Sequence, residues 1–212
     1  MTLQLPRIYP ITDTNISSLD HTQQVEHLLA GGATFIQLRD KQTPARAFFE
    51  DAANAMRLAR EAGATIIVND RVDIALALGA DGVHLGQTDM PVNAARELLG
   101  SKAIIGYSTH NLGQVKAALD LPIDYLALGP IFATRSKRNP DPVVGLDELR
   151  IAKSMAERLP LVAIGGIDRE SMDETFSAGA DSVAMISEIL SRPDNIARNL
   201  RKLLDTSSGQ QC

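Results

Sequence analysis

The sequence lacks the residues and segments on which secreted and membrane proteins depend. It contains no tryptophan and a single cysteine, Cys212, so no disulfide can form within one chain. This favours a reducing compartment. No stretch approaches the roughly 18 apolar residues of a membrane-spanning helix, and the first residues show no signal-peptide pattern. We therefore expect a cytoplasmic protein with no membrane partner.

Several signatures of other protein classes are also absent. No cluster of Cys and His residues indicates a zinc site, and no Gly-x-Ser-x-Gly sequence indicates a hydrolase. The turn after the first predicted strand lacks the Gly-x-Gly-x-x-Gly run of dinucleotide-binding folds. The net charge of −5 argues against a nucleic-acid-binding surface. We expect small-molecule partners, and the oligomeric state stays open, a homo-oligomer included.

What the sequence does contain is a regular alternation of two kinds of segment. With 212 residues, 44% of them hydrophobic, the chain suits one α/β domain with an aliphatic core. Short apolar runs predict eight buried parallel strands at 7–12, 34–39, 66–68, 83–85, 103–106, 123–128, 161–164 and 182–185. Helices are predicted at 20–29, 43–62, 72–78, 90–99, 111–119, 145–159, 168–178 and 193–204.

A glycine-containing corner recurs between helix and strand. Gly32, Gly63, Gly79 and Gly179 each begin a Gly-Ala-Thr or Gly-Ala-Asp sequence, and glycine suits the left-handed position that ends a helix. Eight strand–helix units without a break in composition predict a single small (β/α)8 TIM barrel over residues 1–205, with a polar, frayed tail at 206–212. A doubly wound open sheet is the alternative.

Two carboxylates follow adjacent predicted strands at the centre of the sequence. Asp70 comes after the strand at 66–68, and Asp89 comes after the strand at 83–85. Neighbouring strands lie about 4.8 Å apart, so the two side chains could share one divalent cation. Capping of the following helix is the alternative role for either aspartate.

Cationic and glycine-rich segments occupy other predicted strand ends. Gln37, Arg39 and Lys41 alternate, which favours a polyanion site, or else surface ion pairs of the cations with Asp40 or Glu50. Gly165-Gly166 and Ile186-Ser187 follow the last two strands, where barrels commonly bind phosphate, although a bare turn is the alternative.

The segment 129–144 is long for a connection between strand and helix. Thr134, Ser136 and Lys137 within it suit an anion-contacting edge of a lid, or alternatively a solvated basic loop. Four histidines complete the candidates. His84 is expected to be a hydrogen-bonded barrel histidine, His110 to lie near the site, and His21 and His27 to be solvated on the first helix.

The chain resembles the thiamine-phosphate synthase family, also called thiamine-phosphate pyrophosphorylases, from Tyr9 to about Ile189. The motifs that carry the resemblance are Tyr9-Pro10-Ile11-Thr12-Asp13, Gln37-Leu38-Arg39-Asp40-Lys41, Val68-Asn69-Asp70-Arg71-Val72-Asp73, His84-Leu85-Gly86-Gln87-Thr88-Asp89-Met90-Pro91, Ser108-Thr109-His110, Gly129-Pro130-Ile131-Phe132-Ala133-Thr134, Ile164-Gly165-Gly166-Ile167 and Met185-Ile186-Ser187. The resemblance implies a transferase of thiamine biosynthesis (EC 2.5.1.3) that joins 4-amino-2-methyl-5-(diphosphooxymethyl)pyrimidine to thiazole phosphate. Its products are thiamine phosphate and diphosphate.

The resemblance also assigns roles to individual residues. Asp70 and Asp89 would hold Mg²⁺, the implied cofactor. The diphosphate contacts would be Arg39, Lys41, Asn69 and Lys137. The aminopyrimidine would be held by Gln37 and Ser108, and the thiazole phosphate by Thr134, Ser136, Gly166, Ile186 and Ser187. Leu38, Asp40 and Arg135 are also expected to contact substrate. The catalytic set is Arg39, Lys41, Ser108 and Lys137; the family often has Thr where Ser136 stands.

The implied mechanism is Mg²⁺-assisted dissociative loss of diphosphate, followed by attack of the thiazole nitrogen on a pyrimidine cation. No general base is needed for that attack. Three alternatives stay open: a thiazole tautomerase of the same fold, a non-catalytic regulator that binds thiamine phosphates, and a sugar-phosphate isomerase. The first two would not need the carboxylate pair and the cations together, and the third would need a clear general base.

Overall fold

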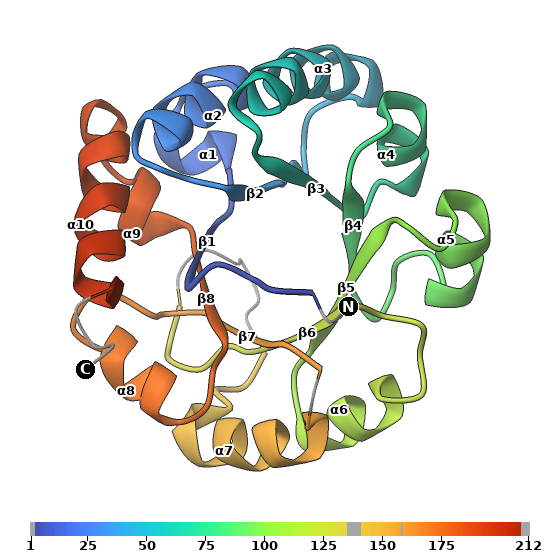
Figure 1. The fold of residues 1–212 in the computed structure, drawn as a ribbon, viewed down its shortest axis with the longest axis vertical. Helices are drawn as coiled ribbons and strands as arrows, with labels where there is room; N and C mark the ends of the chain where they lie inside the picture. Colours follow the sequence, from blue (N-terminus) through green and yellow to red (C-terminus); the bar gives the residue numbers. More distant parts are fainter. Residues whose placement is uncertain (1–2, 135–140, 158, 209–212) are drawn as a thin grey trace.

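The fold is a barrel of eight parallel strands surrounded by helices (Figure 1). The computed structural model describes residues 3–134, 141–157 and 159–208. The strands are β1 (Ile8–Pro10), β2 (Phe35–Leu38), β3 (Thr65–Asn69), β4 (Gly82–Leu85), β5 (Ile104–Thr109), β6 (Tyr125–Leu128), β7 (Leu161–Ile164) and β8 (Ser182–Met185). All eight predicted strands are therefore present.

The sheet closes between its first two strands in sequence. Neighbours follow the order β1-β8-β7-β6-β5-β4-β3-β2. An isolated parallel bridge joins Ile11 to Gln37, and the Thr12 N–H donates to the Gln37 carbonyl oxygen at 2.9 Å. The predicted (β/α)8 barrel is confirmed, and the open doubly wound sheet is not what the chain forms.

Eight of the helices correspond to the predicted ones. They are α2 (His21–Ala30), α3 (Ala45–Ala62), α4 (Val72–Leu78), α5 (Val92–Leu99), α6 (Leu112–Ala118), α7 (Gly145–Ala156), α8 (Met172–Ser177) and α10 (Ile196–Ser208). The prediction missed α1 (Thr14–Ser17) and α9 (Ser187–Leu190), and the first turn of its last helix is the 3-10 turn η1 (Pro193–Asn195). Helices α1 and α9 are too short to show a helical repeat of apolar residues.

Two predicted helix starts are shifted by side-chain hydrogen bonds. Thr43 does not cap α3, because its Oγ1 donates to Asp40 at 2.7 Å and Pro44 precedes the helix instead. Asp168 caps a turn rather than α8, since its Oδ1 accepts from the Ser171 N–H at 2.9 Å. Asp20 does cap α2, with its Oδ1 accepting from the Gln23 N–H at 2.7 Å.

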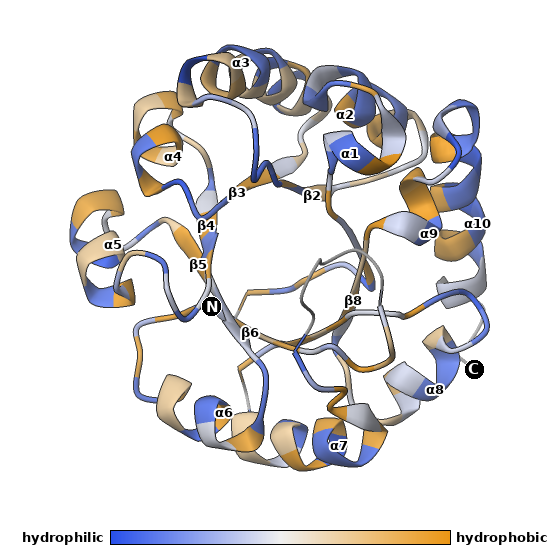
Figure 2. Cartoon of the chain, turned by 180° about the vertical axis from the view of Figure 1, so that it is seen from behind, coloured by the Kyte–Doolittle hydropathy of each residue, from blue (hydrophilic) through white to orange (hydrophobic). Residues whose placement is uncertain are grey.

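The apolar residues form two layers on either side of the strands. One layer lies between strands and helices, and the other fills the barrel interior with Tyr9, Phe35, Ile67 and Tyr125 among its members. Side chains that alternate along each strand supply the two layers in turn. Seen from behind in Figure 2, the surrounding helices mix hydrophilic and hydrophobic residues, as expected for helices with one face on the barrel.

Three aspartates brace the end of the barrel where the strands begin. Each precedes an even-numbered strand and accepts a hydrogen bond from the backbone of the strand before it. The bonds join Asp81 to Ile66 N at 2.7 Å, Asp124 to Ile105 N at 2.8 Å and Asp181 to Leu161 N at 2.7 Å. Asp81 and Asp181 belong to the recurring glycine corners, so those corners also register neighbouring strands.

The last helix continues beyond its predicted end. Residues 206–208 of the expected frayed tail are helical, and Ser207 is 2% exposed. The Thr206 and Ser207 hydroxyls donate to the carbonyl oxygens of Lys202 and Leu204, each at 2.9 Å. Residues 209–212, including Cys212, lie outside the described residues. No helix in the described part of the chain is long and apolar enough to cross a membrane.

Candidate active site

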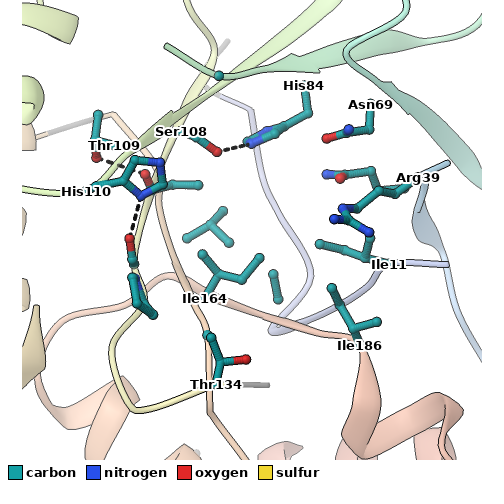
Figure 3. A pocket seen from close by; sticks show the side chains of 18 of the residues that line it. Ile11, Arg39, Asn69, His84, Ser108, Thr109, His110, Thr134, Ile164 and Ile186 are labelled. Carbon is teal, nitrogen blue, oxygen red and sulfur yellow. Dashed lines mark hydrogen bonds between the residues drawn. The ribbon is translucent and has the colours of Figure 1, made fainter. Parts of the chain in front are cut away.

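A cavity of about 410 Å³ opens at the end of the barrel where the strands finish. All eight strands contribute residues to its lining. Figure 3 shows Asn69 and Arg39 on one side of this cavity and Ser108, Thr109 and His110 on the other. The predicted site residues that line it are Gln37, Arg39, Lys41, Asn69, Asp70, Asp89, Ser108, Thr134, Gly166, Ile186 and Ser187.

Two of the predicted substrate contacts do not line the cavity. Leu38 is 0% exposed in the layer between strands and helices. Asp40 instead organises the loop after β2, where burial would raise its pKa, but hydrogen bonds from Thr43, Gln42 and His21 lower the pKa to about 2. The prediction took every residue of the motif as a substrate contact, but adjacent residues of a strand face opposite sides, so Leu38 points away from the cavity. Arg135, Ser136 and Lys137 lie outside the described residues.

The two central aspartates lie close together, and each has a partner. Lys41 pairs with Asp70, while Asp89 Oδ2 accepts from the Gly86 N–H at 2.7 Å. Burial raises the pKa of Asp70, and the neighbouring Asp89 raises it further, against the opposing effect of Lys41. The side chain of Asp70 makes no capping bond to α4, so the capping alternative does not apply to it.

This pair of carboxylates suits Mg²⁺ better than it suits zinc. Among the described residues, no group of three or more His, Cys, Asp or Glu side chains could hold a metal ion. Mg²⁺ commonly takes one or two carboxylates and completes its shell with water and substrate phosphates. Asp70 and Asp89 fit that donor set, provided that a phosphorylated substrate binds beside them.

Arg39 has a carboxylate partner that the sequence prediction did not name. Its guanidinium pairs with Asp13, and Asp13 also accepts from the Asn15 N–H at 3.0 Å at the start of α1. The proposed surface partners are engaged elsewhere, since Glu50 pairs with Arg46 and Asp40 caps its own loop. Asp13 directly follows the predicted strand at 7–12, a strand-end position that could have identified it.

Asn69 carries a donor that no residue in the described part of the chain satisfies. The side chain lines the cavity and is 6% exposed overall, and among the described residues its buried Nδ2 has no hydrogen-bond partner. Burying an unpaired amide N–H costs about 1–3 kcal/mol. The unpaired group therefore marks a place where a ligand oxygen or nitrogen can accept.

The prediction that His21 is solvated is wrong. The ring is 1% exposed, with Nδ1 at 2.7 Å from Thr12 Oγ1 and Nε2 at 3.2 Å from Asp40. Thr12 Oγ1 also accepts from the Arg39 N–H at 3.2 Å. His21 thus supports both sides of the loop that presents Arg39. Its helical spacing from the buried Val25 and Leu28 is the signal that could have shown this.

The two glycines after β7 make room for the loop after β6. Gly166 has φ +67°, and an added Cβ would lie 2.5 Å from the Ala133 carbonyl oxygen. A Cβ at Gly165, where φ is +97°, would lie 2.6 Å from Pro130. The pair is therefore not a bare turn, because the loop that carries Thr134 packs against it at the cavity.

A chain of hydrogen bonds crosses the barrel interior between residues that line the cavity. Gln37 Nε2 donates to Tyr9 Oη at 3.0 Å, and Tyr9 Oη lies 3.0 Å from Tyr125 Oη. His84 Nδ1 lies 2.9 Å from Tyr125 Oη, and His84 Nε2 lies 2.7 Å from Ser108 Oγ (Figure 3). The expectation of a hydrogen-bonded His84 is confirmed. The sequence analysis did not identify the two tyrosines as site residues. Nothing in two separate apolar strands indicates that their hydroxyl groups are hydrogen-bonded to each other in the barrel interior.

His110 also reaches the cavity, as expected. Its Nδ1 lies 2.6 Å from the Gly129 carbonyl oxygen (Figure 3) and 3.5 Å from Asp141. It therefore joins the end of β5 to the start and the later part of the segment after β6.

Known proteins with similar sequences share one activity in their names. The chain matches the family model described as "Thiamine monophosphate synthase" over residues 8–189. It is 44% identical over 209 residues to "Thiamine-phosphate synthase" of Koribacter versatilis, covering 95% of this chain and 97% of that protein. It is 43% identical over 204 residues to the protein of that name from Chloroflexus aurantiacus, covering 95% and 94%.

Solved structures agree with the fold and with this relationship. "Thiamine phosphate pyrophosphorylase from Pyrococcus furiosus" superposes with a TM-score of 0.83 at 36% identity, covering 96% of this chain and 97% of that chain. The structure titled "Native KDPGal structure" has a TM-score of 0.75 at 13% identity, which shows a shared barrel fold alone. The predicted fold class and the predicted transferase activity are confirmed, and the chain belongs to the thiamine monophosphate synthase family.

Proposed function

We propose that this cavity condenses 4-amino-2-methyl-5-(diphosphooxymethyl)pyrimidine with thiazole phosphate by a dissociative route. The observation that supports the proposal is that two groups of residues suited to anions line one cavity. A carboxylate pair with Arg39 and Lys41 lies at the ends of β2 to β4, and Gly166 with Ser187 lies at the ends of β7 and β8. A diphosphate donor and a phosphorylated acceptor together need both features.

The diphosphate would bind where cations and an unpaired donor converge. Arg39 and Lys41 would turn from Asp13 and Asp70 to the substrate oxygens, and Asn69 Nδ2 would gain its missing acceptor. Asp70 and Asp89 would hold Mg²⁺ beside them. When bound, the metal would neutralise the charge of the departing diphosphate. Lys137 is proposed as a further cation at this end.

Bond breaking would precede bond making. The methylene carbon–oxygen bond breaks with its electron pair going to the diphosphate, and the amino group of the pyrimidine stabilises the cation that remains. The thiazole nitrogen then forms the new carbon–nitrogen bond with its own lone pair. No proton needs to be removed, so the chain's task is to orient the two rings and to exclude water.

The two rings would lie on opposite sides of the cavity. Gln37 and Ser108 would hold the aminopyrimidine, and both line the cavity. The thiazole phosphate would contact Thr134, Ser136, Gly166, Ile186 and Ser187. Because such substrates are small metabolites, the protein is proposed to work in the cytoplasm without nucleic-acid or membrane partners, as a monomer or a homo-oligomer.

One assay separates this function from its alternatives. Both substrates are mixed with Mg²⁺, and release of diphosphate is followed together with formation of thiamine phosphate. A thiazole tautomerase would release no diphosphate, and a regulator would bind thiamine phosphate without turnover. EDTA and Asp89→Ala are each expected to slow turnover strongly. The matched control is Asp73→Ala, which is expected to keep wild-type rates. Asp73 is an exposed aspartate of α4 and pairs with Arg71, the residue before that helix. Full activity in EDTA would overturn the metal assignment.

A further inference from the structure

The hydrogen-bonded chain across the barrel interior joins the two residues proposed to hold the pyrimidine. We call Gln37, Tyr9, Tyr125, His84 and Ser108 the relay. Its links are 3.0, 3.0, 2.9 and 2.7 Å long, and both tyrosines are at most 1% exposed. Burial raises the pKa of Tyr9 and of Tyr125, so both phenols stay protonated. Each of the four contacts in the relay is therefore a hydrogen bond with one donated hydrogen.

A missing side chain on β5 allows the relay to form. His84, Gly106 and Tyr125 are register neighbours on three adjacent strands. A Cβ on Gly106 would lie 2.0 Å from Tyr125 Cζ and 2.4 Å from its Oη. Because Gly106 has no Cβ, the Tyr125 ring can stack on His84, with the ring centroids 5.5 Å apart. Both rings can thus meet across an intervening strand, and Tyr9 completes the link from the other side of the barrel.

The direction of the hydrogens follows from the amide at one end. An amide nitrogen cannot accept a hydrogen bond, so the Tyr9 hydrogen is left for Tyr125, and the Tyr125 hydrogen for His84 Nδ1. His84 then donates from Nε2 to Ser108 Oγ. The Gln37 side-chain oxygen can then accept a hydrogen bond from a ligand in the cavity, and the Ser108 hydroxyl can donate one to it. Reversing one end would require every other link to reverse.

We propose that Tyr9, Tyr125 and His84 are positioning residues. They orient Gln37 as a hydrogen-bond acceptor and Ser108 as a hydrogen-bond donor toward the amino edge of the pyrimidine. Such an edge presents an amino N–H beside the lone pair of a ring nitrogen, which needs one acceptor and one donor. The inference rests on the proposed function, because that function places the pyrimidine against Gln37 and Ser108. It adds three interior residues through which the pyrimidine is recognised.

Calorimetry with the aminopyrimidine diphosphate and Mg²⁺ tests the relay. Tyr125→Phe removes the central hydroxyl and keeps the ring against Gly106. It is expected to weaken this binding about tenfold, as for the loss of one buried hydrogen bond, and to leave thiazole phosphate affinity unchanged. In a Ser108→Ala background the same change is expected to cost only about threefold, because interacting residues are not additive. Tyr9→Phe is expected to behave like Tyr125→Phe.

Tyr107→Phe is the matched control. It removes a phenol from the same sheet, but Tyr107 packs in the layer between strands and helices and is expected to bind as the wild type does. Unchanged binding by a folded Tyr125→Phe, or an equal loss in the Ser108→Ala background, would overturn the relay. An equal loss in Tyr107→Phe would do the same. A wild-type protein that binds no aminopyrimidine diphosphate would overturn the proposed function and the relay together.

Discussion

Lys41 pairs with Asp70, so one of the two carboxylates suited to Mg²⁺ already carries a cation of the protein. The Lys41 side chain is 49% exposed and that of Asp70 is 19% exposed, which leaves the lysine free to swing toward the cavity. We propose two roles for the Lys41 side chain. Before substrate binds it offsets the charge of Asp70, and in the complex it would neutralise the diphosphate while the metal would take its place beside Asp70.

Replacing Lys41 should change metal and diphosphate binding in opposite directions. Lys41→Ala removes the cation that competes for Asp70, so divalent affinity in the absence of substrate is expected to rise about two- to fivefold, as for a partly exposed ion pair. Diphosphate affinity is expected to fall because a phosphate partner is lost. Mn²⁺ titration by electron paramagnetic resonance, at about pH 8 to keep Asp70 ionised, measures the first effect. Calorimetry with diphosphate measures the second. A fall in both affinities would contradict the competition.

Metal binding should weaken on acidification earlier than for ordinary carboxylates. Burial and Asp89 raise the pKa of Asp70, and a protonated carboxyl cannot hold Mg²⁺. Divalent affinity is therefore expected to fall as the pH drops through this raised pKa. Without metal, the stability of the fold changes with pH in the opposite direction to metal affinity. The raised pKa of Asp70 favours the folded state at low pH, and this contribution to stability is lost as the pH rises through the pKa that Asp70 has in the folded protein.

Asp70→Asn separates these two effects. It is expected to abolish the part of the pH dependence of Mn²⁺ binding that comes from protonation of Asp70. It is also expected to stabilise the metal-free fold at neutral pH, measured as the free energy of unfolding in urea. If the variant were less stable than the wild type at neutral pH, burial would not be the main cause of the pKa shift.

The fold could be read from the sequence because each unit is local. An apolar run and a helix recur eight times, and a glycine corner links helix to strand at four of these places. Parallel strands joined by helices then have few ways to pack. The helices α1 and α9 were missed because four residues show no periodicity. The residues that the strand-end rule selected and that the structure describes do line the cavity, since the rule needs only the chain order.

Pairings between distant strands could not be read from the sequence. Arg39 and Asp13 lie on loops 26 residues apart, and Tyr9 and Tyr125 are separated by 116 residues. Which carboxylate an arginine chooses, and whether two tyrosines meet, depends on barrel register and on the space left by Gly106. Patterns in a single sequence reveal neither the register of the barrel strands nor the space beside Gly106.

The glycine at 166 should matter for stability as well as for binding. Gly166→Ala places a Cβ 2.5 Å from the Ala133 carbonyl oxygen, so the loop carrying Thr134 must shift. We expect weaker thiazole phosphate binding with little change in pyrimidine diphosphate binding, together with a lower free energy of unfolding. Gly63→Ala is the control. Its φ of +70° is similar, but nothing lies within 4 Å of the added Cβ. It should cost only the backbone term of about 1–2 kcal/mol and leave both ligands unaffected.

Asp124 provides a test of stability away from the cavity. Its Oδ2 accepts from the Ile105 N–H at 2.8 Å and from Arg96 at 2.7 Å, at the end of the barrel opposite the candidate site. Asp124→Ala leaves the Ile105 N–H without its partner, which is expected to lower the free energy of unfolding by roughly 1–3 kcal/mol. The kcat of the folded enzyme should be unchanged.

Urea unfolding and steady-state kinetics on the same samples check both halves of this expectation. Asp120→Ala removes an exposed aspartate just after α6 and should alter neither quantity. Asp181→Ala should repeat the loss of stability, because Asp181 accepts from the Leu161 N–H at 2.7 Å in the equivalent place. If Asp124→Ala lowered kcat at full stability, the two ends of the barrel would be coupled, and these aspartates would do more than register neighbouring strands.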